Sequence, residues 1–162
     1  AVMLILVSDA NILIDIEIGD LTVPMFSLNY QFITPDILYY EELEEHHPHL
    51  KSMGLGIREM DEGLITQVDI LVSKYPKTSR NDIFALVLAD HVSCPLLSGD
   101  KALRVAASHE SVECRGTLWL IRELLEQKKI TPQTARAALQ KMKARQSRLP
   151  WDEAEQIISE FD

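Results

Sequence analysis

Short apolar runs alternate along the chain with stretches in which apolar residues recur at helical spacing. The runs at residues 3–7 and 94–97 are largely apolar, which is typical of strands covered on both faces of a sheet, and residues 31–34 predict another strand. Weaker runs at 55–60 and 111–115 predict two further strands. Helical spacing is found at residues 12–18, 35–45, 64–75, 83–89, 101–108 and 118–125, from 132 onward, and at 149–161. This order predicts an α/β fold with a mostly parallel central sheet.

Residues that begin or end helices mark several of these boundaries. Ser79, with Asp82 three residues on, and Thr131, followed by a proline, have the form of helix N-caps. Gly19 ends the first helix, and the run His46-His47-Pro48-His49 ends the helix after the second strand. Three histidines around a proline are poorly spaced for a tetrahedral metal site, so this run predicts a solvated turn.

The charge of the chain is strongly uneven. The 162 residues are enough for one sizeable core, and they carry a formal net charge of −9. An even spread of that charge would repel a phosphate backbone. However, the net charge is −11 over residues 1–114, +7 over 115–148 and −5 over 149–162. A nucleic-acid partner therefore stays open, and the basic segment is either an RNA-binding surface or a solvated helix face.

Neither a membrane segment nor a disulfide framework is expected. No apolar run approaches the roughly 18 residues of a transmembrane helix, and we expect no signal peptide before the first strand. Cys94 and Cys114 are too few for a disulfide scaffold, which favours two reduced thiols. We therefore expect a cytoplasmic protein with no membrane partner.

Acidic residues stand where the predicted strands end. Asp9 follows the first strand and Asp100 follows the strand at 94–97, while Asp82 begins the helix that leads to that strand. Glu41 and Glu42 lie on the helix after the second strand. Parallel strands end at one edge of their sheet, so these carboxylates could converge there. Such a cluster needs a compensating cation, and oxygen ligands suit Mg²⁺ or Mn²⁺. Taken singly, each acid could equally favour a helix N-terminus or lie on a solvated face.

Ordered motifs around these acids resemble those of PIN-domain nucleases. The resemblance lies in four segments, in the order of the family: residues 8–15 (SDANILID), 79–82 (SRND) with Ala85 and Ala89, 94–104 (CPLLSGDKALR) and 115–120 (RGTLWL). The last segment is similar to the ending of a prokaryotic toxin-like (VapC-type) subfamily. The resemblance implies a PIN-like three-layer α/β/α sandwich. It covers residues 3–127, so we expect a nuclease domain over 1–127 and a helical extension over 128–162, separate or part of the same domain.

The resemblance also implies a role for each acid. By matching position, Asp9, Asp82 and Asp100 would be the first, third and fourth metal-binding and catalytic acids. The second is a glutamate after the second strand. Spacing from the preceding proline favours Glu41 and the following leucine favours Glu42, and we prefer Glu41. The candidates for contacts with substrate are Asn11, Arg80, Lys101 and Arg104.

The function implied by the resemblance is that of a metal-dependent endoribonuclease. One or two Mg²⁺ or Mn²⁺ ions would assist hydrolysis of RNA phosphodiester bonds. The subfamily implies the toxin of a toxin–antitoxin pair, with an antitoxin protein that covers the acidic site, and a homodimer. The alternative is a non-catalytic PIN-like module that binds RNA or protein. A phosphatase of the haloacid dehalogenase class ranks low, because it needs Asp-x-Asp where this chain has Asp9-Ala10-Asn11.

Overall fold

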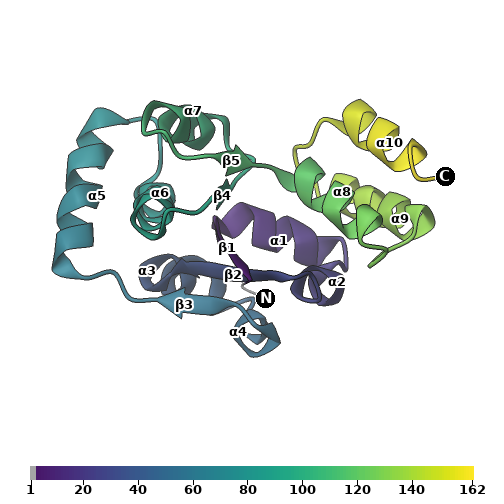
Figure 1. The fold of residues 1–162 in the computed structure, drawn as a ribbon, viewed down its shortest axis with the longest axis horizontal. Coiled ribbons are helices and arrows are strands. Elements are labelled where there is room, and N and C mark those ends of the chain that lie inside the picture. The colour runs from purple at the N-terminus through teal and green to yellow at the C-terminus, as the bar shows by residue number, and fades with distance from the viewer. Residues whose placement is uncertain (1–2) are drawn as a thin grey trace.

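The computed structural model describes residues 3–162, in which five parallel strands form one sheet (Figure 1). The strands are ordered β3-β2-β1-β4-β5, so β1 lies at the centre with β2 on one side and β4 on the other. Their bounds are β1 Leu4–Ser8, β2 Tyr30–Pro35, β3 Gly56–Arg58, β4 Leu96–Leu97 and β5 Cys114–Arg115. The chain winds outward from β1 through β2 to β3 and then returns to β4. The gap between β1 and β4 is therefore the point at which the strand order reverses, where open α/β sheets commonly bind ligands.

Helices flank the sheet and complete an α/β/α sandwich, which confirms the fold class predicted from the sequence. Buried α6 packs against β1, β2 and β4, and α5 packs against α6. Elsewhere on the sheet, the ring of Phe32 meets Phe26 of α2, and Tyr30 meets Trp119 of α8. The α-helices are α1 Ala10–Ile18, α2 Thr22–Phe26, α3 Asp36–Leu38, α4 His49–Met53, α5 Glu62–Lys74, α6 Arg80–Val92, α7 Lys101–His109, α8 Thr117–Glu126, α9 Pro132–Ala144 and α10 Trp151–Ser159.

The helix expected over residues 35–45 has a different form. It consists of the three-residue α3 and then a π-helix, η1, over Tyr39–Leu43. In this turn the Glu44 N–H donates to the Tyr39 carbonyl at 2.8 Å, one residue farther back than in an α-helix. A π-turn inserted into a helix changes the direction in which the following side chains point. This matters because Glu41 and Glu42 both lie on it.

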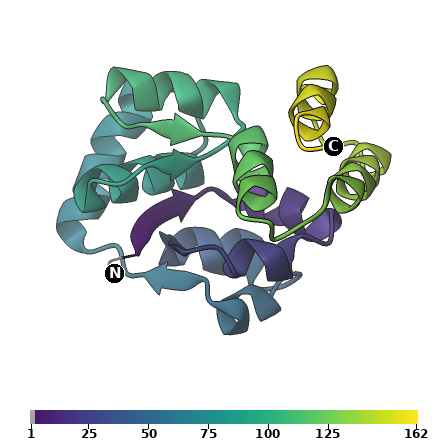
Figure 2. The ribbon, with the colours of Figure 1, turned by 45° about the vertical axis from the view of Figure 1, so that its right-hand side comes forward.

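The C-terminal helices share the core of the sheet domain. Figures 1 and 2 both place α9 and α10 beside α8, and α9 also contacts α1. The buried side chains of Ala138, Met142 and Ile158 belong to the same hydrophobic cluster as β1. The approach of α9 to α1 is close, because a Cβ atom on Gly19 would stand 2.7 Å from the Met142 methyl. No helix within residues 3–162 has the length and apolar character needed to cross a membrane.

Candidate functional site

Asp9 lies at the carboxyl end of β1, where it caps α1. Its Oδ1 accepts the Ile12 N–H at 3.0 Å, and its own N–H donates to the Leu97 carbonyl of β4 at 3.0 Å. The side chain is completely buried, yet its Oδ2 has no hydrogen-bond partner in the described chain. A buried carboxylate oxygen without a partner is costly and calls for an explanation, such as a cation that binds to it.

Asp100 lies at the equivalent point after β4, where it caps α7. Its Oδ2 accepts the Leu103 N–H at 2.9 Å, and its own N–H donates to the Ser98 hydroxyl at 3.0 Å. Ser98 is fully buried. Asp9 and Asp100 therefore end two neighbouring parallel strands, and both are held in place by the helices that they begin.

Asp82 reaches the same edge of the sheet from the start of α6. The cap of α6 is Ser79, whose hydroxyl accepts the Asp82 N–H at 3.2 Å. Because Ser79 satisfies this backbone group, the half-buried Asp82 carboxylate is not needed as a cap. It remains available to face the other acids.

The charges of these aspartates act on one another. Burial raises the pKa of Asp9 to about 7, and the charges of Asp82 and Asp100 add to this rise. The nearby Ser98 hydroxyl, which makes no hydrogen bond of ordinary geometry to Asp9 Oδ2, and the Ile12 N–H oppose it. Burial likewise raises the pKa of Asp82 to about 6, helped by the charge of Asp100. Three of the four acids predicted from the sequence therefore lie within electrostatic range of one another. They form one electrostatic cluster that resists full ionisation.

The two glutamates of η1 differ in their relation to this cluster. The charge of Glu42 raises the pKa of Asp82, whereas Glu41 has no such effect on Asp82 or Asp9. Both glutamate side chains are exposed. This electrostatic effect favours Glu42 as the partner of Asp82, whereas the spacing from Pro35 favours Glu41.

The acids are not arranged as a preformed metal-binding site. Within residues 3–162, no three His, Cys, Asp or Glu side chains lie close enough together to hold one metal ion. The donor chemistry nevertheless fits a hard cation, because Asp9 offers an unpartnered buried oxygen beside two further carboxylates. A cation here would need further carboxylates to move towards Asp9, and the candidates are the exposed Glu42 and the half-buried Asp82, which caps no helix.

Two clefts open beside Asp100. One, of about 460 Å³, has walls that include Asn11, Asp100, Lys101 and Arg148. The other, of about 600 Å³, lies along α7 and includes Lys101 and Arg104. Three of the four predicted substrate contacts therefore line clefts at this edge. The fourth, Arg80, instead pairs with Asp69 of α5 at 2.8 Å and lies over the Phe84 ring.

A family model described as a PIN domain matches residues 5–162, nearly the whole chain. The chain belongs to the PIN-domain family. This confirms the resemblance at the level of the family, whose members are generally nucleases. No curated protein matches the chain. The matched range extends through α9 and α10, beyond the residues 3–127 over which the motifs were found.

Two further residues of this PIN domain lie near the acids, although the sequence did not place them there. The buried Ser98 hydroxyl supports Asp100, and its only sequence signal is its place in Ser98-Gly99-Asp100. Arg148 belongs to the basic segment 115–148, but no local pattern places it beside the acids. It reaches the cleft because the chain between α9 and α10 returns to the edge of the sheet.

Proposed function

We propose that this PIN domain is an endoribonuclease that hydrolyses RNA phosphodiester bonds with the help of Mg²⁺ or Mn²⁺. The observation that carries the proposal is the buried, unpartnered Oδ2 of Asp9 at the reversal point of the sheet. Asp82 and Asp100 lie within electrostatic range of it. Family membership supports the same reaction class.

The four acids would share the work of holding the cation. Asp9 and Asp100 are fixed by the N–H groups that they cap, whereas Asp82 and Glu42 are free to adjust. Glu41, on the same turn, is the alternative for the fourth position. When bound, the cation offsets the crowded carboxylates and polarises the phosphodiester. Lys101 and Arg104, on α7 beside Asp100, would attract the phosphate backbone of the substrate.

One observation favours a second function, a PIN-like module that binds RNA or protein without cleaving it. The carboxylates within residues 3–162 do not stand close enough together for three of them to hold one ion. If they cannot rearrange, the site would be too open for metal-dependent chemistry.

Removal of the metal separates these two functions. We expect the purified protein to cleave labelled single-stranded RNA in the presence of Mg²⁺ or Mn²⁺. Cleavage should stop when EDTA is added and resume when excess metal is added back. Gel separation of the products measures the cleavage, and heat-denatured protein controls for metal-catalysed RNA breakdown. Binding of RNA without cleavage in either metal would favour the module.

We also propose that the protein acts in the cytoplasm as the toxin of a toxin–antitoxin pair and is inhibited by an antitoxin that covers the acidic edge. The support is the toxin-like (VapC-type) motif at residues 115–120. A second copy of the chain would complete a homodimer, as in the resembled subfamily.

The growth of a host that expresses the chain tests whether the protein is a toxin. We expect induction of this chain to arrest growth, and co-expression of the reading frame next to its gene to relieve the arrest. Induction of the Asp100→Asn variant is the control and should leave growth unchanged. Arrest by that variant as well would show that the toxicity does not come from the acidic site.

A further inference from the structure

The segment between α9 and α10 forms one wall of the cleft at the acidic edge. Ser147, Arg148 and Leu149 line this cleft opposite residues of α1 and α7. Asp100 and Lys101 stand on the α7 side. A segment from the C-terminal part of the chain thus borders the site proposed for hydrolysis.

Two contacts fix this segment from the side of the sheet domain. The Ser147 hydroxyl donates to Asp15 Oδ1 of α1 at 2.8 Å, and the Ser147 N–H donates to the Met142 carbonyl of α9 at 3.0 Å. Leu149 packs against the hydrophobic core. Arg148 lies between these two anchored residues, so its backbone position is set.

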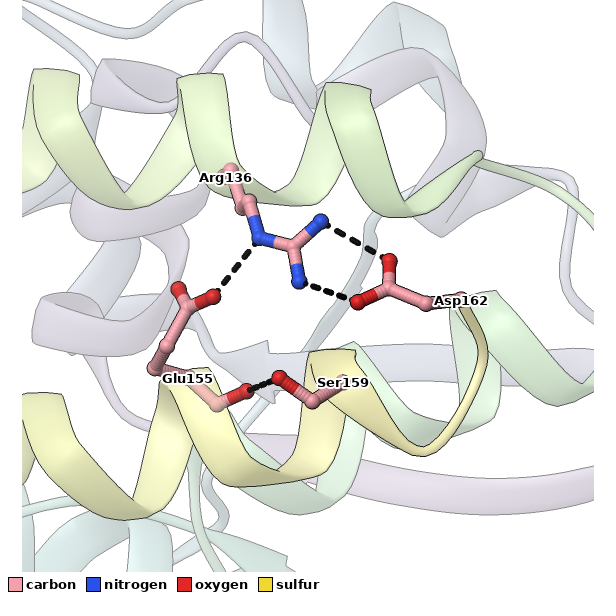
Figure 3. A network of polar contacts seen from close by, with 4 residues as sticks. All are labelled: Arg136, Glu155, Ser159 and Asp162. Atoms are coloured by element: carbon pink, nitrogen blue, oxygen red, sulfur yellow. Dashed lines mark hydrogen bonds and ion pairs between the residues drawn. The ribbon is translucent and has the colours of Figure 1, made fainter.

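Ion pairs fix the same segment from the side of α10 (Figure 3). Arg136 of α9 forms a two-pronged contact with the Asp162 carboxylate, at 2.9 and 2.7 Å, and its Nε donates to Glu155 at 2.7 Å. Arg122 of α8 pairs with Glu160 at 2.7 Å. Together these contacts hold α10 against α8 and α9, which fixes where the connecting segment runs.

Arg148 is a free cation at this position. Its side chain is exposed and makes no hydrogen bond or ion pair within residues 3–162, and the same is true of Lys101 across the cleft. Other basic residues of the C-terminal segment are already engaged, such as Arg136 with its two acids and Lys141 with Asp20. Two carboxylates also line the cleft within residues 3–162: the half-buried Asp15 accepts from the Ser147 hydroxyl, and Asp100 accepts the Leu103 N–H.

We infer that Arg148 binds a backbone phosphate of the RNA strand next to the bond to be cleaved, with Lys101 on the other side of the cleft. The inference rests on the proposed function and adds a residue to it. A guanidinium presents a planar fork of donors that matches phosphate geometry, and an unpaired one loses no partner on binding. The helices α9 and α10 therefore serve to carry this arginine to the site.

Arg145 provides a matched control three residues away. It is also an exposed arginine with no side-chain partner within residues 3–162, but it lines a different cleft, with Glu17 and Asp20. Arg148→Ala and Arg145→Ala remove the same charge from the same segment. Only the first should affect RNA if the position, and not the net charge, matters.

Binding of fluorescein-labelled single-stranded RNA, measured in EDTA at several salt concentrations, tests the inference. We expect Arg148→Ala to weaken binding about tenfold and to lower the slope of log affinity against log salt by about 0.7, the loss of one phosphate contact. Arg145→Ala should stay within about twofold, and Arg148→Lys should recover part of the affinity. In Mg²⁺, Arg148→Ala should raise KM more than it lowers kcat.

The outcomes separate this inference from the proposed function. Equal binding by the two alanine variants would overturn the role of Arg148, even if the wild-type protein cleaves RNA. If the wild-type protein binds RNA but never cleaves it, hydrolysis is overturned, and the comparison of the two variants still decides the phosphate contact. A wild-type protein that neither binds nor cleaves RNA would overturn both.

Discussion

Asp9→Asn should abolish metal-dependent RNA cleavage and, in metal-free buffer at pH 8, make the protein more stable than the wild type. The pKa of Asp9 is about 7 in the folded protein, against 3.8 for an ordinary aspartate. Between these values the folded protein keeps a proton that the unfolded chain has lost, so the stability of the wild type falls as the pH rises from about 4 to 7. Asparagine carries no charge and is an equally good N-cap. The variant therefore does not lose this stability at high pH, and its side chain still accepts the Ile12 N–H.

The size of the effect follows from the difference in pKa. Each unit is equivalent to about 1.4 kcal/mol, so full ionisation of Asp9 above pH 7 costs up to about 4 kcal/mol. The pKa of Asp82 is also raised, to about 6, so its ionisation lowers stability in the same direction. The Asp9→Asn variant therefore still loses some stability as the pH rises towards 6, but less than the wild type. A cation that binds Asp9 would recover the lost stability in the wild type alone.

Thermal unfolding at pH 5 and pH 8, in EDTA and in Mn²⁺, measures this effect. In EDTA, we expect the wild-type Tm to be lower at pH 8 than at pH 5, and we expect Mn²⁺ to raise it again at pH 8. The Tm of Asp9→Asn should change less than that of the wild type, both with pH and on addition of Mn²⁺. Asp90→Asn, an exposed acid near the end of α6, is the control and should follow the wild type. An Asp9→Asn variant that is less stable than the wild type at pH 8 would contradict the prediction.

Much of the fold could be predicted from the sequence because its signals are local. The strand β1 is a continuous apolar run, since α/β sheets bury the central strand on both faces. The caps Ser79 and Thr131 mark the starts of α6 and α9, where each side chain accepts a backbone N–H three residues on. Two short helices, α2 and α4, were missed because five residues are too few for a 3.6-residue period to be recognised.

The acids could be predicted for a related reason, but the rest of the site could not. Asp9 and Asp100 follow apolar runs and begin helices, so their position in the sequence already places them at one edge of a parallel sheet. Arg148 instead reaches that edge through the packing of α9 and α10, which no local pattern records. The π-turn of η1 also left no sequence signal, although it sets the directions of Glu41 and Glu42.

The choice between these two glutamates has a measurable consequence. We expect Glu42→Gln to lower kcat/KM for metal-dependent RNA cleavage roughly 10- to 100-fold, and Glu41→Gln to change it by no more than about threefold. The reason is electrostatic: the Glu42 charge contributes to the raised pKa of Asp82, and the charge of Asp82 contributes to that of Asp9, with no comparable contribution from Glu41.

The pair is well matched, because both side chains are exposed on one turn and both variants remove one negative charge. A loss of general charge repulsion between the protein and RNA would raise the activity of both variants equally, so it cannot imitate the expected difference. Titration with Mn²⁺ adds a second measurement: Glu42→Gln should need more metal for half-maximal activity, and Glu41→Gln should not. A larger loss in Glu41→Gln would instead show that spacing from Pro35 places the fourth acid, and that metal binding rearranges the π-turn.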